Sequence, residues 1–102
     1  MTLSADLTMG GGRVVHVPSV PEPPPASGGK VKVAIPFPAE AKGGVVYGAV
    51  VTNDETGTEM RCAFARLTWL EPGDALTVVF GDDSMAFEDF AALVEGGPDE
   101  RA

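Results

Sequence analysis

The sequence predicts a mainly β protein: a small antiparallel barrel or sandwich of four to five strands, with one C-terminal helix and an extended N-terminal arm. Its 102 residues are enough for one compact domain. Thirteen glycines and nine prolines favour short strands joined by tight turns over long helices. Several apolar runs also alternate with the two-residue period that is typical of half-buried strands.

The arm is predicted to comprise residues 1–29. Three glycines, Gly10 to Gly12, precede a β-branched run at 13–17 that is long enough for one brief strand. Five of the nine prolines then lie between positions 18 and 25, and such a run can join neither a helix interior nor a central strand. We therefore expect an extended polyproline II segment. The glycines are interpreted as a flexible hinge, because the Gly-Lys-Ser/Thr ending of a phosphate loop is absent.

The body is predicted to comprise residues 30–97. Residues 30–37 alternate, which places Val31, Val33, Ile35 and Phe37 on one face of a strand that Pro36 would confine to a sheet edge. The run 45–52 is apolar on both faces, as expected of a central strand. Residues 53–57 then form a hairpin loop in which Gly57 can adopt a positive φ.

The second half of the body contains a change of phase. In the strand predicted at 58–70, Met60, Cys62 and Phe64 share one face, whereas Leu67 and Trp69 have the other parity. A bulge near residues 65–66 would turn both sets inward. A type II turn is expected at 71–74 and a last strand at 75–80. A helix is predicted at 84–95 and a short tail at 98–102, with Asp82, Asp83 and Ser84 offering oxygens for the helix N-cap.

Charge is distributed unevenly along the chain. The net charge is −8, and twelve of the fifteen acidic residues follow position 52. Phosphate backbones and anionic lipid would repel such a surface, so neither a nucleic acid nor a membrane is expected as a partner. The longest apolar run, 43–51, is too short to span a bilayer, and the first residues do not resemble a signal peptide. We expect a soluble protein made in the cytoplasm, whose partners are proteins: its own copies, a larger assembly, or both.

Few residues could perform catalysis. His16 is the only histidine, and it could join a serine and an aspartate in a triad, but no nucleophile-elbow pattern surrounds any serine. A solvent-facing or interface histidine on a strand is favoured. Cys62 is the only cysteine and can form no internal disulfide. Its place on an apolar face favours a buried, unreactive thiol. No catalytic residue and no cofactor is predicted, and an enzyme is not expected.

Acidic side chains could coordinate a hard cation near the predicted helix. Asp82, Asp83, Glu88 and Asp89 carry the oxygen ligands that Mg²⁺ and Ca²⁺ prefer. Helix capping and a solvated helix face account for the same residues, so no metal site is predicted. Zinc is disfavoured by the single histidine and single cysteine.

The stretch 48–56, Gly-Ala-Val-Val-Thr-Asn-Asp-Glu-Thr, combines an apolar strand with an Asp/Thr loop behind a Pro/Gly-rich arm. This arrangement resembles the lambda-type head decoration proteins of tailed phages. The resemblance implies a non-enzymatic virion protein with a compact, mostly β body, and it assigns no residue roles.

Two functions are therefore considered. The first is a structural accessory protein of a symmetric assembly, with a virion decoration or cement protein as the best example. It would bind its neighbours through the arm, at Arg13, Val15, His16, Val17, Pro21 and Pro24. The alternative is a small acidic monomer that regulates or inhibits a partner by covering a basic surface. Its contact would be the acidic face formed by Asp82, Asp83, Glu88 and Asp89.

Overall fold

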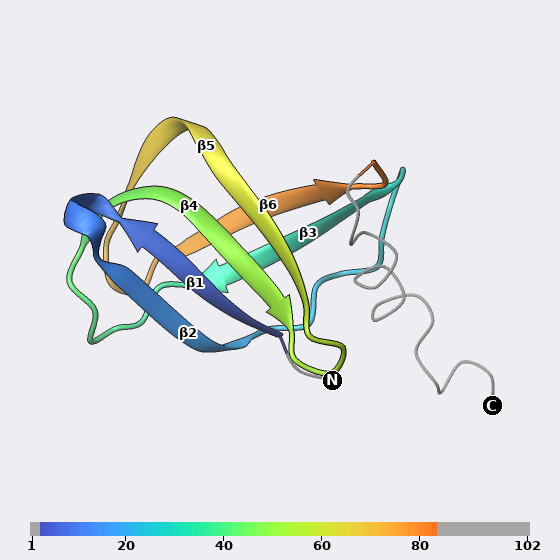
Figure 1. Cartoon of the computed structure of the whole chain (residues 1–102), viewed down its shortest axis with the longest axis horizontal. Coiled ribbons are helices and arrows are strands. Elements are labelled where there is room, and N and C mark those ends of the chain that lie inside the picture. Colours follow the sequence, from blue (N-terminus) through green and yellow to red (C-terminus); the bar gives the residue numbers. More distant parts are fainter. Residues whose placement is uncertain (1–2, 84–102) are drawn as a thin grey trace.

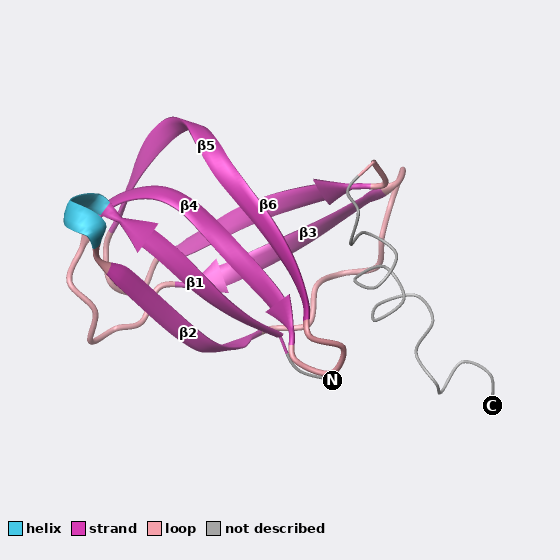
Figure 2. Ribbon diagram, in the orientation of Figure 1, coloured by secondary structure: helices cyan, strands magenta, loops and turns pink. Residues whose placement is uncertain are grey.

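The computed structural model describes residues 3–83, which fold into six antiparallel strands and one short 3₁₀ turn (Figure 1, Figure 2). The predicted mainly β, antiparallel character is confirmed, and the described strands do not form a closed barrel. The predicted helix at 84–95 and tail at 98–102 lie outside the described residues. The elements are β1 (Leu3–Met9), η1 (Gly10–Gly12), β2 (Val14–Val20), β3 (Lys30–Pro36), β4 (Gly44–Asn53), β5 (Thr58–Leu70) and β6 (Ala75–Gly81).

The strands are arranged in two sheets. A four-stranded sheet has the order β2-β1-β4-β5, and a two-stranded sheet pairs β3 with β6. The larger sheet curves over the smaller one, so the molecule has two layers (Figure 1). The chain changes layer through residues 21–29, through the loop at 37–43 and through the turn at 71–74.

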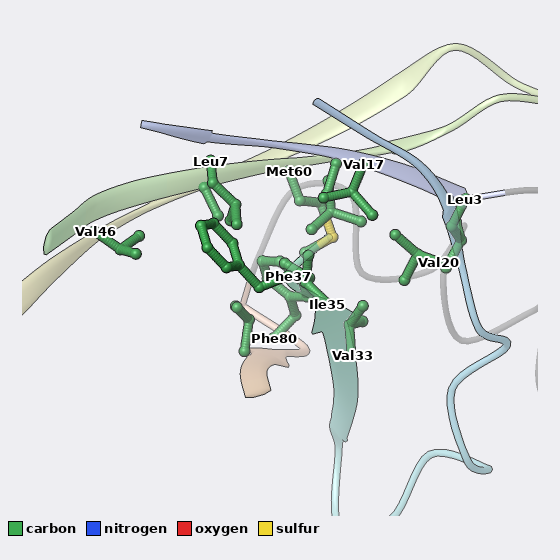
Figure 3. Close-up of a cluster of buried hydrophobic side chains, with 14 of the residues drawn as sticks. Leu3, Leu7, Val17, Val20, Val33, Ile35, Phe37, Val46, Met60 and Phe80 are labelled. Carbon is green, nitrogen blue, oxygen red and sulfur yellow. The ribbon is translucent and has the colours of Figure 1, made fainter. Parts of the chain in front are cut away.

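The hydrophobic core lies between the two sheets (Figure 3). The predicted inward face of β3 is confirmed, because Val31, Val33, Ile35 and the following Phe37 are all buried. Burying each such side chain contributes about 1.5–3 kcal/mol relative to leaving it in water. The other buried apolar side chains are Leu3, Ala5, Leu7, Met9, Val17, Val20, Val46, Ala49, Val51, Met60, Leu70, Val78 and Phe80.

The prediction of an N-terminal arm at 1–29 is wrong for the residues that form β1 and β2. β1 lies between β2 and β4 and pairs with both. Its residues alternate between buried apolar side chains, such as Leu3 and Leu7, and more exposed polar ones, such as Ser4 and Thr8. The pattern is that of a strand with one face on the core. In the sequence this alternation is masked by the glycines and prolines downstream, which dominate the composition of the region.

The three glycines form a tight turn, and the hinge interpretation is therefore also wrong. Gly11 and Gly12 have φ values of 77° and 80°, which side chains with a Cβ rarely adopt. The Met9 N–H donates to the Arg13 carbonyl oxygen at 2.7 Å and closes the turn. The glycines thus permit the β1–β2 hairpin.

The irregularity predicted in β5 is confirmed, but its effect on burial is different. Val46 pairs with Thr68, and Gly48 pairs with Ala63, so residues 64–67 are inserted opposite Tyr47. Tyr47 is itself an extra residue of β4 relative to β1. Because both strands contain insertions at the same place, Met60 before the insertion and Leu70 after it, an even number of residues apart, are both buried, although Thr68 between them is exposed.

Leu67 and Trp69 consequently do not turn inward, which corrects the prediction. Both side chains are 58% exposed, whereas Met60 and Leu70 are buried. The two predicted turns that flank β5 are confirmed, with φ values of 79° at Gly57 and 96° at Gly73.

Candidate functional site

The residues predicted to bind a partner through the arm are dispersed in the structure. Val17 is 3% exposed, and the half-buried Val15 packs against the core. The burial of Val17 contradicts its prediction as a partner contact, whereas for the half-buried Val15 that role stays a prediction. Pro21 and Pro24 are exposed in the connection between β2 and β3.

Arg13 makes an internal contact. Its guanidinium donates to the Lys42 carbonyl oxygen at 2.9 Å and approaches the Gly43 carbonyl oxygen at 3.5 Å. It therefore joins the β1–β2 turn to the loop that precedes β4. This contact explains a half-buried arginine at a turn without invoking a partner protein.

His16 lies on the outer face of the four-stranded sheet, the side away from the core. Its side chain is 62% exposed, and its Nδ1 lies 2.6 Å from Oδ1 of Asp6, the residue directly opposite on β1. The expected solvent-facing histidine is confirmed. Such an exposed cross-strand pair contributes little to stability, typically below about 1 kcal/mol.

The acidic residues of the alternative hypothesis are only partly described. Asp82 and Asp83 are exposed directly after β6. Glu88 and Asp89 lie outside the described residues. Over residues 3–83, no group of three histidine, cysteine, aspartate or glutamate side chains could hold a metal ion. Over the same residues there is no helix long and apolar enough to cross a membrane.

Large exposed apolar side chains gather at one end of the four-stranded sheet. Val14, Tyr47, Leu67 and Trp69 are between 46% and 59% exposed. The strand register places all four at the η1 end, since Val14 pairs with Thr8 and Tyr47 lies opposite the insertion that contains Leu67. We refer to these four residues as the outer patch. A fifth large apolar side chain, Val79, is exposed on the other sheet.

A shallow hollow of about 350 Å³ adjoins this patch. Gly48 is one of its lining residues. The rest of the lining comes from three neighbouring strands: Thr8, Tyr47, Ala49, Val50, Arg61, Cys62 and Ala63. The surface thus combines an apolar depression with one cationic side chain.

Trp69 is held in place on the surface. Its indole Nε1–H donates to Oε2 of Glu71, and its backbone is paired with Val45 of β4. A tryptophan that is already fixed loses little side-chain entropy when a partner covers it. Tryptophan and tyrosine are also the side chains that most often dominate protein interfaces. The parity of Trp69 in the sequence predicts a core position instead, because the compensating extra residue of β4 leaves no local signal.

Cys62 lies on the core side of β5 and is half-buried. Burial raises the pKa of its thiol above the ordinary value, and a hydrogen bond with the backbone of Ala49 lowers it by a smaller amount. The thiolate is therefore scarce at neutral pH, as the predicted unreactive thiol requires.

We expect Cys62 to react slowly with a disulfide reagent in the native protein. At pH 7.5 its rate should be more than about tenfold below the rate in denaturant, because native burial disfavours the thiolate and blocks access. The native rate should increase as the pH is raised through the alkaline range. Absorbance of the released thiolate measures both rates. Equal native and denatured rates would show that the thiol is accessible.

Comparison with known proteins does not identify this chain: no protein-family model matches it, and neither a curated protein nor a solved structure shows significant similarity to it.

Proposed function

We propose that this protein is a non-enzymatic structural accessory protein that binds other proteins in a symmetric assembly through the outer patch. The observation that carries the proposal is the gathering of Val14, Tyr47, Leu67 and Trp69 at one end of one sheet. The outer patch replaces the arm as the contact surface, because β1 and β2 belong to the fold.

The chemistry of the patch supports this proposal. Exposed apolar side chains beside a depression are typical of protein interaction sites, and Tyr47 belongs to both the outer patch and the hollow. Trp69 and Tyr47 could supply the central aromatic anchors, and Arg61 could supply a charged contact beside the hollow. A second copy of the chain is the partner that we test first, since a symmetric assembly repeats one surface. A virus capsid is the assembly that the sequence resemblance suggests.

We expect the substitution Trp69→Ser to weaken self-association by about 30-fold, which corresponds to the ~2 kcal/mol typical of an interface tryptophan. Sedimentation velocity over a range of protein concentrations measures the association. The experiment should be done at physiological ionic strength or above, because a net charge of −8 opposes association at low salt.

The control is Val79→Ser, which removes an apolar side chain of similar exposure, 49%, from the other sheet. It should leave self-association unchanged. Association of copies through the outer patch would be refuted if the wild-type chain remained monomeric at every concentration. It would also be refuted if both substitutions changed self-association equally.

A further inference from the structure

Four of the described strands lie at sheet edges: β2 and β5 in the larger sheet, and β3 and β6 in the smaller one. An edge strand presents unpaired backbone N–H and C=O groups that can pair with another chain. Natural proteins usually protect such edges with proline, charge or irregular register. The edges can therefore be compared by these three devices.

Three of the edges are protected. β2 contains Pro18, and its register with β1 is irregular near its end. β5 contains the insertion at 64–67 and the charged Arg61 and Arg66. β3 contains two exposed lysines, Lys30 and Lys32, and ends in a proline.

β6 has none of these features. Ala75–Gly81 contains no charged residue and no proline, and its register with β3 is continuous from end to end. Within residues 3–83, β3 is the only strand that pairs with β6. In an antiparallel pair, alternate residues direct their backbone groups away from the partner strand. Between Ala75 and Val79 of β6, the backbone N–H and C=O groups of these alternate residues therefore point to the open edge of the sheet.

Charge is asymmetric across this small sheet. Asp74 precedes β6, and Asp82 and Asp83 follow it. The lysines lie on β3, the other strand of the pair. A chain that added to β6 would therefore find a neutral, β-branched strand with acidic residues at both ends.

We propose that the open edge of β6 binds an extended segment of a partner protein, which adds to the β3-β6 sheet as a third strand. The chemistry of the edge selects a segment with an uncharged, β-branched centre and a lysine or arginine at each end. The proposal uses a different surface from the outer patch and does not depend on it.

The test uses a fluorescein-labelled peptide of the length of β6, seven residues, with the sequence Lys-Val-Thr-Val-Thr-Val-Lys. Fluorescence anisotropy should show binding to the wild-type chain that weakens as salt is added. A counterpart with glutamate at both ends should bind at least tenfold more weakly. Absence of binding by the lysine peptide would overturn the proposal.

Two N-methylated peptides distinguish strand addition from other modes of binding. Only alternate N–H groups of an added strand face its neighbour. Methylation of one alternate set should therefore reduce affinity at least tenfold, and methylation of the other set should change it less than threefold. An equal effect of the two methylated sets would show that the peptide does not bind as a strand.

Substitutions on the protein locate the binding edge. Thr77→Lys adds a charge on β6, and the matched Ala34→Lys adds the same charge to the residue directly opposite on β3; both positions are exposed. We expect Thr77→Lys to weaken peptide binding at least tenfold and Ala34→Lys to weaken it less than threefold. Equal effects would overturn the proposal.

Two further outcomes would show that the β6 edge binds another chain, or that the peptide binds another surface. If the wild-type chain self-associated and the Thr77→Lys variant did not, a second copy of the chain would occupy the β6 edge. This outcome would contradict binding of a separate partner protein there. If Trp69→Ser weakened peptide binding, the peptide would bind the outer patch, which also contradicts the proposal. Retained peptide binding by Trp69→Ser, together with unchanged self-association, would refute the proposed function while leaving the β6 edge supported.

Discussion

Deletion of residues 1–29 is expected to unfold the protein. β1 is an inner strand of the larger sheet, and Leu3, Ala5, Leu7 and Met9 are each at most 1% exposed. Each of the three larger side chains contributes about 1.5–3 kcal/mol by burial, and a small domain has only about 5–15 kcal/mol of net stability. Loss of the strand would also leave β4 without one of its two neighbours. Circular dichroism and urea unfolding of the truncated chain measure the effect.

A pair of point substitutions separates loss of the core from loss of chain length. Leu7→Ala should reduce the free energy of unfolding by about 2–5 kcal/mol, because a fully buried leucine leaves a cavity. The adjacent Thr8→Ala, at an exposed position of the same strand, should change it by less than about 0.5 kcal/mol. A truncated chain with an unchanged cooperative transition would restore the arm interpretation.

Substitution of Gly48 by alanine is expected to destabilise the protein through overpacking between two paired strands. An added Cβ would lie 2.8 Å from the carbonyl oxygen of Cys62 on β5. Because that atom belongs to the backbone of a paired strand, the sheet itself must shift. We expect the free energy of unfolding to fall by about 1–3 kcal/mol, as for other overpacked sites. Urea denaturation measures the change.

Gly10→Ala is the matched control for this experiment. Its added Cβ would meet Tyr47 at 3.5 Å, which is ordinary van der Waals contact, and Gly10 has no positive φ. The substitution should therefore alter stability by less than about 0.5 kcal/mol. If the two variants had the same denaturation midpoint, close approach of β4 and β5 at Gly48 would not explain the need for glycine there.

The two proposed contact surfaces lie on different layers of the molecule. The outer patch belongs to the four-stranded sheet, whereas the β6 edge belongs to the two-stranded sheet. They would be occupied by different chemistry, apolar anchors in the first case and backbone hydrogen bonds in the second. Each can be removed by substitution without touching the buried core, so each can be tested separately.

The candidate site was less predictable than the fold. Val17 was expected to contact a partner, but it is buried in the core. Trp69 was expected in the core, but it is exposed. In both cases the sequence shows an apolar side chain in a strand without showing which side of the sheet is covered. Of the predicted contact set, His16 and the two prolines are exposed, Arg13 and Val15 are half-buried, and Val17 is buried.

Local patterns in the sequence were sufficient to predict the class of fold and most of its strands. Alternation in β3, the turn residues Gly57 and Gly73, and the phase change in β5 depend on local rules of backbone and side-chain geometry. The tertiary structure alone decided that β1 is an inner strand and that Leu67 and Trp69 face outward. The first outcome depends on pairing of β1 with β4, a strand distant in sequence, and the second depends on the extra residue Tyr47 of β4, which compensates the insertion in β5. Register between distant strands is set by the packing of the whole sheet, which no local pattern contains.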